Sequence, residues 1–414
     1  MTNPGKIKIL YVHHGRGIGG APLSLLYLLQ KLDRKKYEPT VLCLYESKAT
    51  DLYRHENIRT FVARAISVFN NTTLSCGNAS VKGRIFNFAC SMMKMPVSVV
   101  MTYLWVKKIS PDIVHLNSAG LIAGAIGAKL AGKKVVWHIR EPLFESLLGL
   151  RAFLSKVCIE KFSDKIIAIG KYEADRLFKS PKVTVIYNFV DFDRFNRDIS
   201  GGSFRKEFNI RANQKVVSML GGLSLVKGTM TVVEALATVR KVIPNVKLVI
   251  VGRYPITKNL GNKYYEKILN IVESKKIKDN IIFAGVRNDI PRILSASDVL
   301  VFPSTVPHSA RPVIEAAAMG KPAIASNLGG LNELIVDDIT GRLVPSEDSK
   351  KLAEAVLEVL LNEQKAKKMG ETGYKRAKSL FDADVNAKMT FDVYEEISKD
   401  VERYFPGEGE KYVQ

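Results

Sequence analysis

Residues 302–330 read FPSTVPHSARPVIEAAAMGKPAIASNLGG, and this segment decides how the second half of the chain folds. An apolar run that ends at the start of the segment predicts a strand, and Pro312 suits the first turn of a helix over 313–319. Gly320 favours the end of that helix. The segment therefore predicts a strand, a helix and a second strand, with Glu315 about one turn into the helix.

Short runs rich in β-branched residues alternate with helix-length segments along the chain. The runs are IKILYV, PTVLCLY, DIVHL, KVVWHI, KIIAI and VTVIY, followed by KVVSML, VKLVIVG, NIIFAG, DVLVF and PAIAS. The alternation predicts parallel sheets with crossover helices, and its restart near Lys215 predicts two Rossmann-like α/β domains in tandem. We expect an N-terminal domain over 1–195, a linker over 196–213, a C-terminal domain over 214–381 and a C-terminal helix over 382–414 that could return to the N-terminal domain.

The composition is that of an ordinary soluble globular protein, with 46% hydrophobic and 25% charged residues in 414. The four cysteines form no CxxC pair and have no zinc-like spacing, so neither a disulfide framework nor a metal site is predicted. The first apolar run is too short for the core of a signal peptide. These features predict a cytoplasmic protein.

Positive charge is concentrated in the first half of the chain. Residues 1–200 contain 30 Lys and Arg against 15 Asp and Glu, whereas residues 201–414 contain 32 against 26. No nucleic-acid-binding motif is present, and the aromatic residues do not alternate with the basic ones, so nucleic acid is not expected as a partner. An anionic membrane surface fits, because each Lys or Arg near such a surface contributes about 1 kcal/mol. A solvated basic face is the alternative.

Residues 84–109, RIFNFACSMMKMPVSVVMTYLWVKKI, are mostly apolar and have basic residues at both ends. Lys94 and Pro96 interrupt the run, which disfavours a transmembrane helix. One or two amphipathic helices with snorkelling lysines are predicted, lying on a membrane surface. The alternative is a core helix of the N-terminal domain.

Two glycine-rich segments follow predicted strands. GRGIGG, residues 15–20, matches GxGxxG and has Glu46 at the end of the next strand, which by itself would indicate dinucleotide binding. The same loop suits any helix whose N-terminus approaches a phosphate or a sugar. In GGLSLVKG, residues 221–228, the glycines allow backbone amides to approach an anion, and Lys227 could place its ammonium on a diphosphate. A solvated surface lysine is the alternative.

Glu315 is expected near the carboxyl ends of the second sheet, where open parallel sheets bind ligands. A phosphate at the N-terminus of the helix over 313–319 gains roughly 0.3–1 kcal/mol from the helix dipole. Glu315 would then accept hydrogen bonds from both hydroxyls of a ribose. Alone, a glutamate in this position more often only complements the dipole.

The order and spacing of the motifs resemble the retaining glycosyltransferases of family 4, which have the GT-B fold. The matching segments are GIGGAPLSLLYLLQKL, PDIVHLNS, KVVWHI, SDKIIAIGKYEADRL, VIYNFVDFDRF, GGLSLVKGTMTVVEAL, VKLVIVG, IIFAGVRNDIPRILSASDVLVFPS and VIEAAAMGKPAIASNLGGLNELIVDDITGRLV. The resemblance implies a UDP- or GDP-sugar donor held mainly by the C-terminal domain and a saccharide or lipid-linked acceptor on the N-terminal domain. It also implies no cofactor and no metal, with the acidic DFD at 191–193 as a structural turn.

The resemblance also assigns residues. His138 is expected beside the transferred sugar and Lys227 on the diphosphate, as the two catalytic residues. The residues expected to bind the nucleotide-sugar are Gly19, Gly20, Gly221, Lys227, Arg253, Val286, Arg287, Ser309, Arg311, Val313, Ile314 and Glu315. The implied mechanism is front-face transfer with retention, in which the leaving diphosphate helps to deprotonate the acceptor hydroxyl. The implied setting is cell-surface polysaccharide synthesis at the cytoplasmic face of a membrane.

Two positions depart from the family pattern. Pro307 stands where the first glutamate of a pair is expected, and Gly222 stands where an arginine is expected. His308, Ser309 or Arg311 could replace the first, and Arg253 or Arg311 could assist Lys227 in place of the second. A catalytically silent partner subunit therefore remains an alternative, as does a sugar-nucleotide epimerase or nicotinamide enzyme on similar domains.

Overall fold

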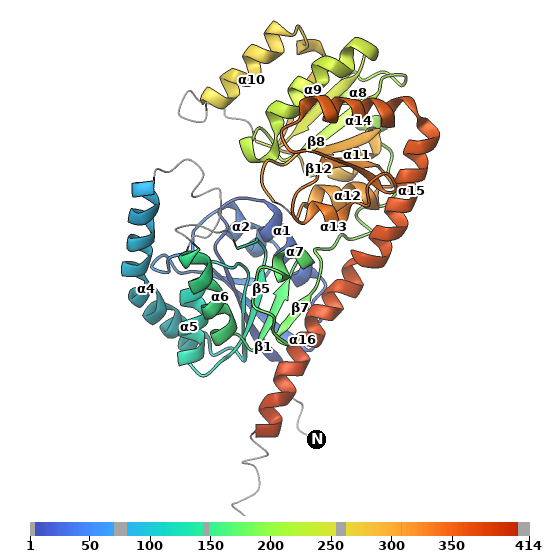
Figure 1. Cartoon of the computed structure of the whole chain (residues 1–414). Helices are drawn as coiled ribbons and strands as arrows, with labels where there is room; N and C mark the ends of the chain where they lie inside the picture. Colours follow the sequence, from blue (N-terminus) through green and yellow to red (C-terminus); the bar gives the residue numbers. More distant parts are fainter. Residues whose placement is uncertain (1–4, 70–80, 144–148, 254–261, 308, 405–414) are drawn as a thin grey trace, which may run out of the picture. The chain divides into compact units, whose positions relative to one another are not determined.

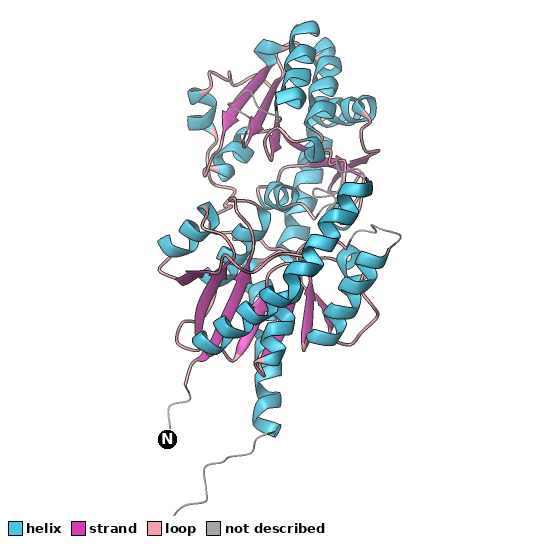
Figure 2. Ribbon diagram, turned by 90° about the vertical axis from the view of Figure 1, so that its left-hand side faces the viewer, coloured by secondary structure: helices cyan, strands magenta, loops and turns pink. Residues whose placement is uncertain are grey.

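The computed structural model describes residues 5–69, 81–143, 149–253, 262–307 and 309–404. The chain forms two compact units, the first made of Met1–Asn188 with Ala383–Gln414 and the second of Phe189–Asp382. Each unit contains one parallel sheet flanked by helices (Figure 2).

The first unit contains a seven-stranded parallel sheet in the order β3-β2-β1-β4-β5-β6-β7 (Figure 1). Its strands are β1 (Ile7–His13), β2 (Tyr37–Cys43), β3 (Arg59–Val62), β4 (Ile113–Leu116), β5 (Lys134–Ile139), β6 (Lys165–Ala168) and β7 (Val183–Val185). Its helices are α1 (Gly20–Gln30), α2 (Lys48–His55), α4 (Val81–Ile109), α5 (Ile122–Leu130), α6 (Leu150–Phe162), α7 (Lys171–Ala174) and α16 (Ala383–Tyr404).

The two faces of the first sheet differ in chemistry, because successive side chains of a strand point to opposite faces. On one face, strand residues such as Val114 and Trp137 form an apolar core with residues of α4, α5 and α6. In Figure 1 these three helices lie together on one side of the sheet. On the other face the neighbouring positions are polar and buried, among them His115 and His138, and α16 packs there through Tyr394.

Helix α4 is a single helix that continues through Pro96, where the sequence predicted one or two amphipathic helices or a core helix. One side of α4 packs on α5 so closely that a Cβ on Gly127 would lie 2.7 Å from the Cβ of Thr102. The opposite side carries a second apolar stripe with exposed side chains. These are Phe86, Met93, Val97, Val100 and Leu104, which are 52% to 79% exposed. The helix therefore has a packed side, as expected of a core helix, and an exposed apolar side, while its contact with a membrane surface stays a prediction.

The second unit contains a six-stranded parallel sheet in the order β10-β9-β8-β11-β12-β13. Its strands are β8 (Val216–Leu220), β9 (Lys247–Val251), β10 (Ile281–Gly285), β11 (Val299–Phe302), β12 (Ala323–Ser326) and β13 (Gly341–Val344). Its helices are α8 (Gly202–Glu207), α9 (Thr229–Val242), α10 (Asn262–Ser274), α11 (Ile290–Ala296), α12 (Arg311–Ala318), α13 (Leu331–Leu334), α14 (Ser349–Leu361) and α15 (Glu363–Leu380), with short 3₁₀ turns η1 (Leu225–Lys227) and η2 (Lys278–Asn280). A continuous apolar core joins this sheet to α9 and α14.

The unit boundary lies a few residues before the expected one, after Asn188 instead of 195. The reason is that Val190 donates its N–H to the carbonyl of Phe381 at 2.9 Å, which ties this stretch to the second unit. The expected linker over 196–213 also belongs to the second unit. There, α8 packs on α11, and Arg205 donates two hydrogen bonds to the carbonyl oxygen of Ala296.

Each sheet has a switch point, where strand order reverses and neighbouring loops diverge. In the first sheet it lies between β1 and β4, and in the second between β8 and β11. Open α/β sheets bind ligands at such points, beyond the carboxyl ends of the strands. The loops there begin at 14 and 117 in the first unit, and at 221 and 303 in the second.

Candidate functional site

The loop after β8 is shaped by two glycines with positive φ. Gly221 has φ +136° and Gly222 has φ +71°. A Cβ on Gly222 would lie 2.3 Å from the carbonyl oxygen of Arg253, which is closer than side-chain contacts allow. Gly222 also donates its N–H to the carbonyl of Val251 at 2.8 Å. The structure therefore leaves no room here for the arginine of the family pattern, and the backbone of Arg253 lies against Gly222.

Lys227 closes this loop at the end of η1. Its ammonium nitrogen lies 4.8 Å from the centroid of the Phe302 ring, at the end of β11. Burial lowers the pKa of Lys227 from its usual 10.5 to about 8. The stem of Lys227 runs past Gly221, where an added Cβ would lie 3.4 Å from Cγ. Gly221 and Lys227 are thus brought together at the switch point, and their binding of a nucleotide-sugar stays a prediction.

Bonds from the loop after β11 hold the Lys227 turn in place. Ser304 donates from its hydroxyl to the carbonyl of Val226 at 2.8 Å, and Thr305 donates its N–H to the same carbonyl at 3.1 Å. Gly228, with φ +71°, approaches Pro303 so closely that a Cβ would lie 1.8 Å from its carbonyl oxygen. The two loops of this switch point therefore form one rigid unit.

Glu315 lies on α12, one turn from the N-terminus of the helix. It is 8% exposed, and its Oε1 lies 3.1 Å from Nη2 of Arg311. Arg311, itself 6% exposed, also donates from Nη1 to the carbonyl of Phe189 at 3.1 Å. Arg311 is therefore part of the support of Glu315. Its guanidinium contacts Glu315 and the carbonyl of Phe189.

The other expected residues of this segment differ in their exposure. Val313 and Ile314 are each 2% exposed, so their side chains belong to the core and only their backbone could contact a ligand. Ser309 is partly exposed in the loop before α12. His308 lies outside the described residues.

Arg287 and Val286 follow β10, away from the β8–β11 switch point in strand order. The guanidinium of Arg287 pairs with Glu207 at 2.6 Å and with Asp289 at 2.8 Å. These carboxylates raise the pKa of Arg287 above its usual range. Val286 is 64% exposed. The structure thus gives Arg287 a role within the second unit, fastening the segment before β8 to the loop after β10.

In the first unit, Gly19 and Gly20 form the start of α1 beside the switch point. Both are exposed, and a Cβ on Gly19 would meet no atom within 4 Å. Gly15 is the crowded glycine of this loop, because a Cβ there would lie 2.5 Å from Nε2 of His13. The protein itself therefore requires a glycine at Gly15, and Gly19 has open space in front of it.

His138 lies near the carboxyl end of β5 and is 3% exposed. Its Nδ1 is 3.2 Å from Nε2 of His115, and its Nε2 is buried with no hydrogen-bond partner among the described residues. Burial and the nearby charge of Arg140 lower the pKa of His138 well below the usual value, so the ring is neutral near pH 7.

Three polar residues that the sequence analysis missed lie farther along the same face. His13 contacts Asn117 at 3.0 Å, and Asn117 accepts a hydrogen bond from Nε of Arg140 at 2.8 Å. Burial lowers the pKa of His13 to about 3. A signal was available, because polar residues occupy alternate positions near the ends of β1, β4 and β5, in YVH, HLN and HIR.

No group of three His, Cys, Asp or Glu side chains is arranged to hold a metal ion within the described ranges. The turn at 191–193 is held locally, because Asp191 accepts the N–H of Asp193 at 3.0 Å. The prediction of no cofactor and no metal stays a prediction.

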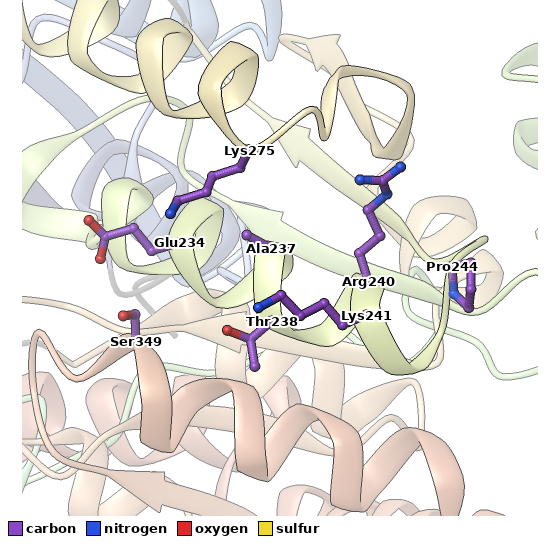
Figure 3. Close-up of a pocket in the computed structure, with 8 residues that line it drawn as sticks. All are labelled: Glu234, Ala237, Thr238, Arg240, Lys241, Pro244, Lys275 and Ser349. Atoms are coloured by element: carbon purple, nitrogen blue, oxygen red, sulfur yellow. The ribbon is translucent and has the colours of Figure 1, made fainter.

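A separate groove of about 560 Å³ lies in the second unit between α9, the end of α10 and the start of α14 (Figure 3). It is lined by Glu234, Ala237, Thr238, Arg240, Lys241, Pro244, Lys275 and Ser349. None of these is an expected site residue. In Figure 3 the side chain of Arg240 extends away from Glu234 and Ser349, so the polar groups do not converge on one point.

Solved structures superpose on nearly the whole chain. The crystal structure of Anabaena HepE in complex with UDP superposes with a TM-score of 0.78 at 22% identity, covering 94% of this chain and 100% of that one. Sucrose-phosphate synthase of Thermosynechococcus elongatus gives 0.72 at 20% identity, covering 95% and 100%. The expected GT-B fold is confirmed.

Sequence comparison gives the family. A model described as Glycosyltransferase Family 4 matches residues 18–194, and one described as Glycosyl transferases group 1 matches residues 202–376. The chain belongs to the family 4 glycosyltransferases. It is 28% identical to the Escherichia coli UDP-Gal:alpha-D-GlcNAc-diphosphoundecaprenol alpha-1,3-galactosyltransferase, over 86% of this chain and 88% of that protein. It is also 28% identical to the N-acetyl-alpha-D-glucosaminyl L-malate synthase of Bacillus anthracis, over 70% and 75%.

Proposed function

We propose that this glycosyltransferase moves a hexosyl group from a UDP- or GDP-sugar to a saccharide or lipid-linked saccharide, with retention, in the synthesis of a cell-surface polysaccharide. The observation that carries the proposal is the pair of rigid loops at the β8–β11 switch point, which present Lys227 and lead into the helix of Glu315. The E. coli relative, whose name gives a UDP-galactose donor and a diphosphoundecaprenol-linked acceptor, supports the same class of reaction.

The nucleotide would be bound by groups of opposite character. Lys227 supplies a positive charge to the diphosphate. The N–H groups of Gly221 and Gly222 both donate to the carbonyl of Val251, so these two glycines shape the turn instead of donating to the ligand. Glu315 accepts from the ribose hydroxyls. A carboxylate has room for about four hydrogen bonds, so its contact with Arg311 leaves acceptor capacity.

Charge on the leaving diphosphate increases as the glycosidic bond breaks. A partly buried ammonium stabilises that charge more strongly than water would, because the local dielectric is low and no reorganisation is needed. The absence of an arginine at Gly222 leaves Lys227 with more of this task. Arg253, whose backbone packs on Gly222, is the residue that we propose to assist Lys227.

The sugar would be contacted from the first unit by His138. Its ring is neutral, which suits hydrogen bonding to sugar hydroxyls better than neutralising phosphate. The exposed glycines 19 and 20 would let a ligand approach the start of α1.

A lipid-linked acceptor would require the enzyme to reach a membrane, and α4 supports this part of the proposal. Its exposed apolar stripe is accompanied by Lys94, Lys107 and Lys108, all exposed. Among the described helices, Ile85–Ile109 is the one long and apolar enough to cross a membrane, by length and composition alone. Because Thr102 and Val106 on its other side are fully buried against the domain, we propose that α4 lies on the cytoplasmic membrane surface and does not cross it.

The membrane proposal is tested by replacing Val97, Val100 and Leu104 together with Ser. We expect binding to anionic vesicles to be largely lost, while nucleotide affinity is unchanged. The matched control replaces Val242 and Leu361 with Ser, two exposed apolar residues of the second unit, and should bind vesicles normally. Wild-type binding should weaken with salt without vanishing, because charge attraction is screened and apolar insertion is not. Unchanged vesicle binding by the α4 variant would refute this part.

The reaction itself is tested by incubating the protein with UDP- and GDP-sugars and undecaprenyl-diphosphate-linked saccharides in anionic vesicles. Transfer with the donor's anomeric configuration preserved, read by NMR of the product, is the expected result. Inverted product would refute retention. A protein that binds nucleotide-sugar but neither transfers nor hydrolyses it would favour the silent partner, for which Pro307 is the motivating departure.

A further inference from the structure

Three side chains form a hydrogen-bonded chain that leads from the C-terminal helix to His138. The hydroxyl oxygen of Tyr394, on α16, lies 2.8 Å from Nδ1 of His115, on β4. Nε2 of His115 lies 3.2 Å from Nδ1 of His138, on β5. Tyr394 and His115 are fully buried and His138 is 3% exposed. The chain ends on Nε2 of His138, which is buried and has no partner among the described residues.

Both imidazoles in this chain are neutral at ordinary pH. Burial is the main cause that lowers the pKa of His115 and of His138, and the charge of Arg140 acts in the same direction. A neutral imidazole has one N–H and one bare nitrogen, so it donates on one side and accepts on the other. The direction of the Tyr394 hydrogen bond therefore determines which nitrogen of His138 carries the proton.

The surroundings of the Tyr394 hydroxyl favour one direction. Burial raises the pKa of Tyr394 well above its usual value, so the hydroxyl keeps its proton. Within the described part of the chain, Nδ1 of His115 at 2.8 Å is the partner that lies at hydrogen-bond distance from this hydroxyl. The Tyr11 hydroxyl also faces Tyr394 and contributes to raising its pKa, but no described residue lies at hydrogen-bond distance from it, and it is therefore the more distant acceptor. If Tyr394 accepted from His115, its own buried proton would have only the more distant Tyr11 hydroxyl to donate to, which is less favourable than the 2.8 Å bond to His115. Tyr394 therefore donates to His115, and His115 donates from Nε2 to His138.

We infer that Tyr394 and His115 are positioning residues that hold His138 with its proton on Nε2, as a hydrogen-bond donor to an uncharged sugar oxygen. The identity of that ligand rests on the proposed function, whereas the tautomer does not. In this state His138 is a donor at the reacting end of the ligand and not a base, which agrees with a mechanism in which the leaving diphosphate takes the acceptor proton.

Residues near the end of the chain thus take part in a site built from β4 and β5. Ion pairs fasten α16 to the first unit on either side of Tyr394, from Lys31 to Asp384 at 2.8 Å and from Lys165 to Glu396 at 2.6 Å. Tyr394 is therefore held in a fixed position. Its effect on His138 would be lost if α16 were removed or displaced.

The tautomer is measured directly by NMR of the full-length protein labelled with ¹⁵N-histidine, using two-bond nitrogen–proton correlations. The His138 signals are assigned by comparison with His138→Gln. We expect the wild-type ring to carry its proton on Nε2, and Tyr394→Phe to shift a measurable share of it to Nδ1. A wild-type His138 protonated on Nδ1 would overturn the inference without any further variant, as would an unchanged tautomer in folded Tyr394→Phe.

The matched control is Tyr37→Phe. Tyr37 contacts the same helix, with its hydroxyl 3.5 Å from Glu395 and its ring centroid 6.1 Å from that of Tyr394, but it has no bond to the histidines. This variant should leave the His138 tautomer and kcat as in the wild type. A tautomer shift of equal size in Tyr37→Phe would mean that packing of α16 is the cause, and would overturn the role of the Tyr394 hydroxyl.

The kinetic measurement separates this inference from the proposed function. In Tyr394→Phe we expect kcat to fall roughly tenfold, the effect of one hydrogen bond made near the transition state, with KM for the nucleotide-sugar unchanged. Suppose that the wild type turns over and that Tyr394→Phe changes neither kcat nor the His138 tautomer. This result would overturn the inference and leave the proposed function standing. Suppose instead that the tautomers of wild type and Tyr394→Phe are as expected, but that the wild type turns over no nucleotide-sugar. This result would refute the proposed function and leave the positioning role of Tyr394 standing.

Discussion

The two switch points of this glycosyltransferase are built in opposite ways. At the one in the second unit, positive-φ glycines shape the backbone and a half-buried lysine provides charge. Beside the one in the first unit, strand side chains carry the polar groups, and burial keeps His13, His115 and His138 neutral. A positive charge suits a diphosphate, whereas neutral directional hydrogen-bonding groups suit sugar hydroxyls. The chemistry of the second unit's switch point thus fits a diphosphate, and that of the first unit's fits sugar hydroxyls.

The largest effect is expected for Lys227→Gln, which removes charge but keeps most of the side chain. We expect kcat to fall by roughly 100-fold or more, as when one preorganised donor to a developing negative charge is removed. Folding should not suffer, because the half-buried ammonium is itself destabilised by desolvation. The comparison is His138→Gln, which should lower kcat with no change in nucleotide affinity. Equal loss of nucleotide affinity in both variants would contradict a division of roles.

Glu315→Gln is expected to weaken nucleotide binding about tenfold by removing charge-assisted bonds to the ribose, measured by calorimetry. Glu315→Ala should in addition lower stability, because Arg311 would then be buried without its carboxylate, and breaking a buried pair costs about 3–5 kcal/mol. Comparing the two variants thus separates the contribution of Glu315 to nucleotide binding from its contribution to stability through Arg311. Full affinity in Glu315→Gln would end the ribose assignment.

Nucleotide affinity should depend on pH through Lys227. The lysine binds a diphosphate in its protonated form, and its pKa in the free protein is about 8. Affinity should therefore decline as pH rises above about 8, with protons taken up on binding. The stability of the free protein should change in the opposite direction and increase as pH rises from 8 toward 10.5. The reason is that the unfolded chain binds the Lys227 proton more tightly than the folded protein does, so the cost of burying a protonated Lys227 falls as the proton is lost. In Lys227→Gln both contributions should disappear.

The smallest effect on activity is expected at Gly222, where a substitution tests whether the backbone conformation requires a glycine. Gly222→Ala should lower the free energy of unfolding by about 1–3 kcal/mol, because φ is +71° and a Cβ meets Arg253. Gly222→Arg should fare no better and should not raise activity. The control is Gly19→Ala, whose Cβ has open space and whose stability should change little. A more active Gly222→Arg would show that Arg253 does not replace the missing arginine.

Local sequence patterns were enough to predict the parallel sheets, the two units and the neighbourhood of Lys227 and Glu315. Each of these depends on residues close together in the chain. The contact between Gly222 and Arg253 was not predictable, because it arises where turns after two different strands pack backbone to backbone. Tyr394 was missed for the same kind of reason, since 279 residues separate it from His115. The full burial of Val313 and Ile314 was also missed, because a motif identifies positions near a ligand without saying which side of the helix faces it.

The central claim is that the β8–β11 switch point binds the diphosphate of a nucleotide-sugar. It is tested most directly by thermal unfolding with UDP and GDP, for the wild type and for Lys227→Gln with Glu315→Gln. A ligand at 100 times its Kd stabilises the native state by about 2.7 kcal/mol. The account predicts a clear rise in Tm for the wild type with one of the two nucleotides and little or none for the double variant. No rise with either nucleotide, or an equal rise in both proteins, would contradict it.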